Sequence, residues 1–400
     1  MLLYAQHGYA PGDKMLRAVQ ERFINGVILS PRYLSPETAN RIIEDLRGIR
    51  MDLDVLFDPE FYATIKIGTP NAHLGSLEQW PYFRLRRRND LLVGTSAIDD
   101  TLRLAYQAQK DLDCSAIIAP NIYISGSFDS IESAIAISFI TRAKSVAEGM
   151  GIREPLYVTL AICKDALINR HECINFINIL TSLDTPPDGI YTLIGAGPTD
   201  ARSGATRSEI LIPEVLGGWM LLNHAMFING LRTMNGCSDI FSPLLGIAQG
   251  TVGATGWWSN LQVFSMGKYI KGQQGGQQPL IRYLSKRLMN RITLHEREAF
   301  SEILPAIMNG LSTDSFYIGQ EPTRTEEALQ GWQALSTLTN DLIYGDINED
   351  LAHLEAQIMR AKEAYTELQS HGLSQKYESN IEYLAILERS INYFREVAEI

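Results

Sequence analysis

Residues 156–162 read Leu-Tyr-Val-Thr-Leu-Ala-Ile, a run of apolar and β-branched side chains that predicts a buried strand. A helical pattern follows at 172–183. Residues 189–194, Gly-Ile-Tyr-Thr-Leu-Ile, then give a second strand that ends at Gly195-Ala196-Gly197. A strand, a helix and another strand in this order predict two parallel strands, because only a long crossover connection can join parallel neighbours.

The same alternation continues towards both ends of the chain. It gives eight predicted strands with helical patterns in most of the gaps, which is the order of a (β/α)8 barrel. The alternative is an open doubly wound sheet, but the G-x-G-x-x-G fingerprint is missing after the first strand. We therefore predict an α/β protein in which residues 1–260 form a TIM-like barrel with an insertion at about 60–95. The other strands are predicted at 2–6, 26–29, 53–57, 115–119, 238–241 and 251–257, and the other helices at 13–23, 38–46, 97–112, 129–149 and 213–231.

The pattern changes after the barrel. Residues 261–280 contain a Gly/Gln-rich stretch that predicts a flexible linker. Residues 281–400 have an almost wholly helical pattern that ends in an antiparallel hairpin. This hairpin either packs on its own barrel or makes 346–400 a site for a protein partner or self-association. Its two apolar seams contain Leu351, Leu354, Ile358, Ala361, Tyr365 and Leu368, and then Ile381, Leu384, Ile391, Phe394 and Ala398.

The composition excludes several classes of protein. Hydrophobic residues make up 45% of the chain and charged residues 20%, so a large core is expected and disorder is not. No apolar run is long enough for a membrane span, since even 211–230 contains Glu214, Asn223 and His224. Four scattered cysteines, at 114, 163, 173 and 237, form neither a disulfide framework nor a paired zinc signature. With no signal sequence in the pattern, we predict a cytoplasmic protein without metal or cofactor.

Charge is distributed unevenly along the chain. The net charge is −11, which argues against a uniformly basic surface for nucleic acid. From 240 to 295, however, there is no Asp or Glu, whereas 296–400 carry 19 acids against 7 bases. The acid-free segment predicts either a site for an anion or nucleic acid, or a solvated loop that pairs with the acidic tail. Its cations are Lys268, Lys271, Arg282, Lys286, Arg287 and Arg291.

Asp58 is the first candidate for chemistry. It follows the apolar run Val55-Leu56-Phe57 and precedes Pro59. In a barrel, the residues after the strands line the catalytic face. A carboxylate at the edge of an apolar interior can have a raised pKa and serve as acid, base or nucleophile. The alternative is a turn-capping aspartate.

Three further polar residues follow predicted strands. Lys164 could form a Schiff base or bind an anion, or it could simply start a helix beside Asp165. His7 could shuttle protons or be structural. Asn121, after the fourth strand, is a candidate for binding substrate. These histidine and carboxylate positions do not have the spacing of a metal site.

Two clusters predict binding of an anionic or planar substrate. The arginines of the insertion could bind phosphate at the barrel mouth, or form a surface strand that pairs with nearby aspartates. The glycines and tryptophans at two strand ends could hold a planar ring such as a nucleobase, or could fill the barrel and its turns. The arginines are Arg84, Arg86, Arg87 and Arg88, and the second cluster is Gly195, Gly197, Thr255, Gly256, Trp257 and Trp258.

Several of these strand ends resemble the tRNA-guanine transglycosylase group of barrels, over about 190 residues. The run 54–58 is similar to the strand that carries a catalytic aspartate there. Residues 188–197 are similar to its glycine-rich strand end, and 238–243 to a later strand with an aspartate. The resemblance implies that Asp58 attacks a sugar anomeric carbon while bases exchange. The chain departs from the group by lacking its Cys/His zinc subdomain, and by having Ser242 at the later aspartate or displacing it to Asp239. These departures imply loss of activity as an alternative.

Two functional hypotheses follow. In the first, the chain is an enzyme acting on a nucleobase, nucleoside or phosphorylated substrate through Asp58. In the second, it is a non-catalytic barrel that binds protein or nucleic acid in a defence or modification complex. The expected partners are an anionic small molecule or nucleic acid, and no membrane.

Overall fold

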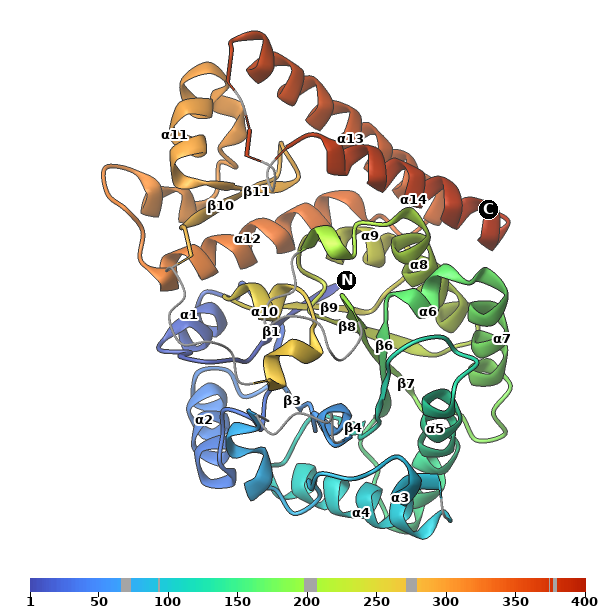
Figure 1. Cartoon of the computed structure of the whole chain (residues 1–400). Helices are drawn as coiled ribbons and strands as arrows, with labels where there is room; N and C mark the ends of the chain where they lie inside the picture. Colours follow the sequence, from blue (N-terminus) through green and yellow to red (C-terminus); the bar gives the residue numbers. More distant parts are fainter. Residues whose placement is uncertain (66–72, 93, 198–206, 271–278, 374, 377–379) are drawn as a thin grey trace.

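Parallel strands form a nearly closed ring in the computed structural model, which describes residues 1–65, 73–92, 94–197, 207–270, 279–373, 375–376 and 380–400 (Figure 1). The hydrogen-bonded order is β3-β2-β1-β9-β8-β7-β6-β4, and the short β5 pairs with β6. The strands are β1 (Leu2–Gln6), β2 (Gly26–Leu29), β3 (Asp54–Phe57), β4 (Ile117–Ala119), β5 (Tyr123–Ile124), β6 (Leu156–Cys163), β7 (Gly189–Gly195), β8 (Arg232–Gly236) and β9 (Val252–Thr255).

The two ends of this sheet meet between β3 and β4. The amide of Ser115 donates to the carbonyl of Val55 at 2.8 Å, and the amide of Val55 donates to Ser115 Oγ at 3.0 Å. An open sheet would leave these strands at opposite edges. The predicted (β/α)8 barrel is therefore confirmed, and the doubly wound alternative is wrong.

Helices surround the ring as the alternation predicts. The start of α2 shows why the local sequence folds this way: Ser35 Oγ accepts from the amide of Thr38 at 3.2 Å, and Pro36 occupies the first turn. Shorter helical turns occupy the loops. The barrel helices are α1 (Lys14–Gln20), α2 (Pro36–Ile49), α3 (Asn89–Leu92), α4 (Ser96–Asp111), α5 (Ile131–Gly149), α6 (Asp165–Ile168), α7 (Arg170–Thr181), α8 (Pro213–Ile228), α9 (Ser242–Ile247) and α10 (Ser259–Gln262).

The strand predicted at 238–241 is wrong, because β8 lies earlier and Asp239–Phe241 form a 3-10 turn. The true strand contains the polar residues Thr233 and Asn235, which hide its apolar pattern. Both are buried because α8 satisfies their side chains. Asn235 Oδ1 accepts from Trp219 Nε1 at 2.7 Å, and Thr233 Oγ1 donates to Asn223 Oδ1 at 2.6 Å.

The region after the barrel differs from prediction in two places. Of the predicted linker at 261–280, residues 263–270 are mostly buried at the barrel mouth, because they carry the apolar side chains of Phe264, Met266 and Tyr269, and residues 271–278 lie outside the described residues. Residues 281–400 are not wholly helical, since β10 (Arg282–Ser285) and β11 (Asn290–Thr293) form an antiparallel hairpin. The helices that follow are α11 (Leu294–Ile303), α12 (Arg324–Leu342), α13 (Ile347–Ser370) and α14 (Glu382–Ala398).

The last two helices form the predicted antiparallel pair and pack on their own barrel (Figure 1). Ion pairs Lys362–Glu388 and Glu355–Arg395 join residues that run in opposite directions along α13 and α14. The contact between α14 and α8 is close, since a Cβ at Gly217 would lie 2.5 Å from the ring of Tyr393. The seam residues of α13 are fully buried inside this one chain. No described helix has both the length and the apolar character that a membrane crossing requires.

We expect deletion of residues 346–400 to destabilise the whole protein. The deletion exposes the face of α8 that packs on Phe394 and Tyr393, and α8 is apolar on nearly all its sides. Thermal unfolding and light scattering should show a lower midpoint and aggregation. Met359→Glu, at an exposed position on α13, is the control and should leave both unchanged. A truncated chain as stable as the full one would contradict this packing.

Candidate active site at the barrel mouth

Three neighbouring strands place polar residues in a row where they end. His7, Ser30 and Asp58 follow β1, β2 and β3. The amide of His7 donates to the carbonyl of Ile28 at 2.9 Å, and the amide of Asp58 donates to that of Leu29 at 3.0 Å, so the parallel ladder holds the row in register. This is the carboxyl-terminal face of the barrel, where barrel enzymes carry their chemistry.

The Asp58 carboxylate is buried and uses its two oxygens differently. Oδ1 accepts from the amide of Glu60 at 2.9 Å, which is the turn-capping bond. Oδ2 accepts from the hydroxyls of Tyr62 at 2.9 Å and Tyr191 at 3.1 Å. Tyr191 lies on β7, and the Gln6 amide of β1 donates to its hydroxyl at 3.2 Å. Asp58 therefore caps its turn and also joins a polar cluster that spans the barrel.

Glu60 places a second carboxylate beside Asp58. It is buried and has a left-handed backbone, with φ +48°. Its oxygens accept from Ser30 Oγ at 2.6 Å and from the Tyr269 hydroxyl at 2.7 Å. Lys268 Nζ lies 3.5 Å from the same carboxylate and 5.0–5.7 Å from the centroids of three aromatic rings. Glu60 and Lys268 therefore form a buried ion pair that joins the loop after β3 to the 263–270 segment.

Burial shifts the pKa values of this cluster. Burial, helped by the charge of Glu60, raises the pKa of Asp58 to about 6, while Lys268 opposes the shift. Burial also raises the pKa values of Tyr62 and Tyr191 well above the ordinary range, so both hydroxyls remain donors at neutral pH. A carboxylate that titrates near neutrality beside fixed donors is suited to act as base or nucleophile.

The raised pKa of Asp58 predicts a pH effect on stability. Between about pH 4 and 6 the folded protein keeps a proton on Asp58 that the unfolded chain has released, so the free energy of unfolding falls as pH rises through this window. Asp58→Asn removes this contribution. Urea unfolding of both proteins across pH 4–7 should show the wild type losing stability relative to the variant. A constant difference between them would contradict the shift.

His7 is buried against the rings of Tyr33 and Trp257, with centroids at 6.3 Å and 6.2 Å. Burial lowers its pKa to about 4, so the imidazole is neutral at pH 7. Neither ring nitrogen has a hydrogen-bond partner among the residues that the structure describes. Because the imidazole stays neutral at pH 7, it is better suited to binding a group by hydrogen bonds than to shuttling protons.

Asp239 is held in a buried ion pair. Arg291 of β11 donates to its two oxygens at 3.1 Å and 2.7 Å, and the Thr255 hydroxyl donates at 2.9 Å. Burial opposes ionisation, but Arg291 outweighs it and holds the pKa of Asp239 below its usual range. Ser242, the other position singled out by the sequence, shares a hydrogen bond of 2.8 Å with Ser238. Asp239 therefore joins the barrel to the β10–β11 hairpin through its ion pair with Arg291.

Other predicted residues are engaged in local structure. Lys164 precedes α6 and donates to the carbonyl of Glu209 at 2.8 Å. Asn121 donates to the carbonyls of Thr159 at 2.9 Å and Ala136 at 3.3 Å. Both side chains thus bind backbone carbonyls of neighbouring segments.

The glycine and tryptophan cluster divides between two places. Gly195 and Gly197 lie beside Tyr123, whose hydroxyl donates to the Gly197 carbonyl at 2.8 Å. A Cβ at Gly256 would lie 2.6 Å from Leu261, so this glycine allows α10 to approach. Trp257 and Trp258 both donate to the carbonyl of Tyr9 at 2.9 Å, on the rim next to His7.

The arginines of the insertion contact the helices around the barrel. Arg86 is buried and donates to Thr101 of α4 at 3.0 Å, and Arg88 pairs with Glu132 of α5 at 2.8 Å. The amide of Arg87 donates to Asp90 of α3 at 2.9 Å, and the carbonyl of Arg84 accepts from Thr64. These contacts do not bring the four arginines together with Asp58.

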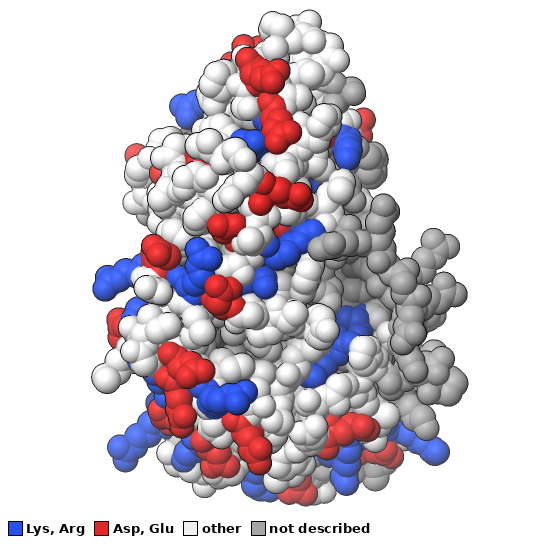
Figure 2. Space-filling model, turned by 90° about the vertical axis from the view of Figure 1, so that its left-hand side faces the viewer, with Lys and Arg blue, Asp and Glu red and all other residues white. Residues whose placement is uncertain are grey.

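The cations of the acid-free segment are dispersed. Lys268 enters the mouth, Arg291 binds Asp239, and Lys286 pairs with Asp341 at 3.0 Å. Arg282 and Arg287 lie in and beside the β10–β11 hairpin, and Lys271 is outside the described residues. On the face drawn in Figure 2, acidic and basic side chains are interspersed.

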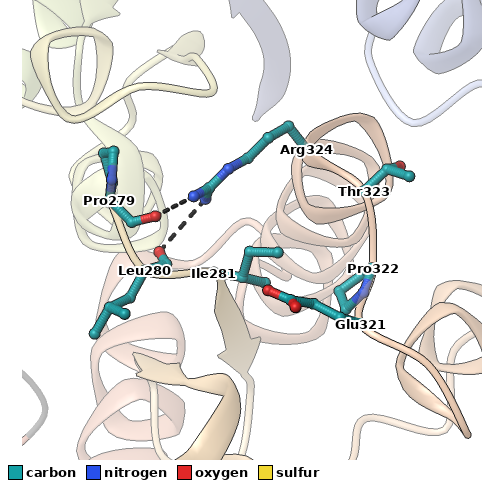
Figure 3. Close-up of a pocket in the computed structure, with 7 residues that line it drawn as sticks. All are labelled: Pro279, Leu280, Ile281, Glu321, Pro322, Thr323 and Arg324. Atoms are coloured by element: carbon teal, nitrogen blue, oxygen red, sulfur yellow. Dashed lines mark hydrogen bonds between the residues drawn. The ribbon is translucent and has the colours of Figure 1, made fainter. Parts of the chain in front are cut away.

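A surface cavity of about 480 Å³ lies between the segment before β10 and the start of α12 (Figure 3). It is lined by residues 279–281 and 321–324, at the start of α12. Arg324 donates to the carbonyls of Pro279 and Leu280 across it. None of its lining residues belongs to the Asp58 cluster.

Gln6, Glu60, Tyr191 and Tyr269 of the Asp58 cluster were not predicted from the sequence. The Asp-Pro-Glu spacing at 58–60 was the one signal for Glu60. Tyr191 lies within a predicted strand, where an aromatic residue is expected to pack in the hydrophobic core. Among the described residues, no three His, Cys, Asp or Glu side chains gather to hold a metal ion.

Comparisons with known proteins do not assign the chain to a family. No family model matches the chain, and a search of curated proteins gives no match. Among solved structures, the chain is similar to a fungal multi-domain GH3 β-N-acetylglucosaminidase described as having a GCN5-related glucosamine N-acetyltransferase region, with 12% identity and a TM-score of 0.39. The match covers 91% of this chain and 42% of that chain. The fold assignment therefore depends on the strand pairing and not on this similarity.

Proposed function

We propose that the chain is a barrel enzyme acting on a nucleobase, nucleoside or phosphorylated substrate, with Asp58 as the reacting carboxylate. The observation that carries the proposal is the position of Asp58 Oδ2, buried at the strand ends and held by two tyrosine hydroxyls from β7 and the β3 loop. Turn capping needs only Oδ1, so it leaves the Oδ2 cluster unexplained.

The reaction that best suits this carboxylate is base exchange of the transglycosylase kind. Asp58 attacks the anomeric carbon, the carbon–nitrogen bond to the departing base breaks, and that base takes up a proton. The incoming base then gives up a proton, attacks the same carbon and releases Asp58. The exchange balances without an oxidant or other co-reactant, and the tyrosine hydroxyls hold the Asp58 side chain in place as the carboxylate before attack and as the glycosyl ester between the two steps.

Substrate must displace the segment that covers Asp58. Lys268 and Tyr269 of this segment bind Glu60, and the ring of Phe264 lies 5.1 Å from that of Tyr62. Opening it exposes Glu60, whose carboxylate could then accept a substrate hydroxyl or base N–H. The segment would close again over the bound substrate and exclude water from the covalent intermediate.

The test is base exchange itself. The full chain is incubated with isotopically labelled guanine and with RNA, DNA or nucleosides in turn, and incorporation is measured by mass spectrometry. Intact-protein mass after acid quenching should reveal an adduct on Asp58. Incorporation or an adduct supports the proposal, whereas the absence of both with every substrate overturns it.

A second candidate is a non-catalytic binding subunit, and one observation favours it: Asp58 is 1% exposed, and the hydroxyls of Tyr62 and Tyr191 already occupy its Oδ2. In that case the cluster merely fills the mouth. RNA or DNA binding that is unchanged by Asp58→Asn, with no exchange, would support this candidate.

A further inference from the structure

His7 is a buried polar group without a partner. Its side chain is 1% exposed, and both ring nitrogens lack a hydrogen bond among the described residues. An unsatisfied buried polar atom destabilises a fold, so it persists where it has another use. The position is not an arbitrary core site, because His7 is the first residue after β1 on the face that carries Asp58.

The polar groups around His7 are already engaged elsewhere. Arg32 donates to the Tyr33 hydroxyl at 2.9 Å and to the carbonyl of His73 at 3.1 Å. Trp257 donates to the carbonyl of Tyr9. Lys14, whose ammonium lies 5.6 Å from the ring of Trp257, donates to the carbonyls of residues 10 and 11. The donors of Arg32, Trp257 and Lys14 therefore have other partners, and Tyr33 and Trp257 present ring surface to the imidazole.

We infer that His7 is a substrate-binding residue, whose imidazole hydrogen-bonds an uncharged planar base lying against the rings of Tyr33 and Trp257. This inference rests on the proposed function and assigns a recognition group to it. Asp58 would perform the chemistry and His7 would select the ring.

The chemistry of the site favours a base over a phosphate. A neutral imidazole offers one N–H and one lone pair, which match the donors and acceptors on the edge of a heterocycle. A phosphate would need cations or a set of convergent N–H groups, and the nearby Arg32 and Lys14 are bound to protein oxygens. The two rings, at 6.2–6.3 Å from the imidazole, provide the π surface that a planar ligand requires.

The rim offers a way in for such a ligand. Tyr9 is 68% exposed and its ring lies 6.3 Å from that of Tyr33. Displacing the exposed Tyr9 would open a way to His7 along the ring of Tyr33 without disturbing the strands. Burial lowers the pKa of His7, and the charge of Glu60 opposes that shift.

The experiment replaces the imidazole with an apolar ring. His7→Phe should weaken binding of labelled guanine at least tenfold in equilibrium dialysis, leave binding of inorganic phosphate unchanged, and raise the midpoint of thermal unfolding, because it removes two unsatisfied nitrogens. The matched control is His224→Phe, whose imidazole bonds Gln249 at 2.8 Å far along the chain on α8. It should lower the midpoint and leave guanine binding unchanged.

The outcomes separate this inference from the proposed function. Guanine binding that is equal in wild type and His7→Phe overturns the inference and leaves the proposed function standing. A wild-type protein that binds no guanine, adenine, cytosine or uracil overturns both. If the midpoint of His7→Phe falls as much as that of the control, the imidazole is a satisfied structural group and the inference is overturned.

If His7→Phe fails to fold, ¹⁵N spectra of the wild-type histidines decide. A shift of the His7 nitrogens on adding guanine supports the inference, and no shift contradicts it.

Discussion

Asp58→Asn is expected to lower base-exchange turnover by at least about 10²-fold, the smaller loss typical of removing a positioned acid or base. The loss is larger if Asp58 is the nucleophile, since an amide cannot form the glycosyl intermediate. Asparagine has nearly the same shape and can still accept from the amide of Glu60. Substrate affinity should therefore stay within a few-fold, which steady-state kinetics and equilibrium dialysis can measure separately.

Asp54→Asn is the matched control for this experiment. Asp54 lies at the opposite end of the same strand, where it accepts a hydrogen bond from the Tyr4 hydroxyl. It changes one carboxylate of β3 to an amide without touching the mouth. Turnover should remain that of the wild type. If Asp58→Asn turns over as fast as Asp54→Asn, then Asp58 has no part in the chemistry.

The barrel could be predicted because its strands are buried on both faces. Runs such as those of β6 and β7 are almost continuously apolar, which is the pattern of a parallel sheet covered by helices. β8 escaped prediction because Thr233 and Asn235 are buried but polar, and their partners on α8 are invisible in the local sequence. The β10–β11 hairpin escaped for a similar reason, since buried Asn290 and Arg291 interrupt its apolar residues.

The site could be predicted only as far as local sequence reaches. Asp58 stands out because it follows an apolar strand and precedes a proline. Its partner Tyr191 lies on β7 across the ring, and Lys268 reaches Glu60 from a segment that reads as a linker. The arginine cluster shows the limit of a charge pattern: four cations within five residues attract notice, whereas Arg86, Arg87 and Arg88 contact α4, α3 and α5. A composition pattern records the charge but not the direction in which each side chain points.

The second large effect concerns Arg291→Met, which should destabilise the protein by about 3–5 kcal/mol, the usual cost of leaving one partner of a buried ion pair uncompensated. Arg291 and Asp239 have side chains only 9% and 4% exposed, and the guanidinium donates to both oxygens of this carboxylate, to which the Thr255 hydroxyl also donates. Lys286→Met is the control. Its partner Asp341 is 56% exposed, so its loss should cost no more than about 1 kcal/mol.

The same pair decides whether the barrel and the β10–β11 hairpin unfold together. Asp239 follows β8 in the barrel and Arg291 belongs to β11, so the pair crosses from one to the other. Arg291→Met combined with Asp239→Asn removes the uncompensated charge and should recover most of the lost free energy of unfolding, as measured by urea unfolding with tryptophan fluorescence. Limited proteolysis of the single variant should cut near the hairpin before the barrel. A single variant as stable as Lys286→Met would mean that packing at Trp332, whose indole donates to the Thr255 carbonyl at 3.2 Å, holds the two parts together without the ion pair.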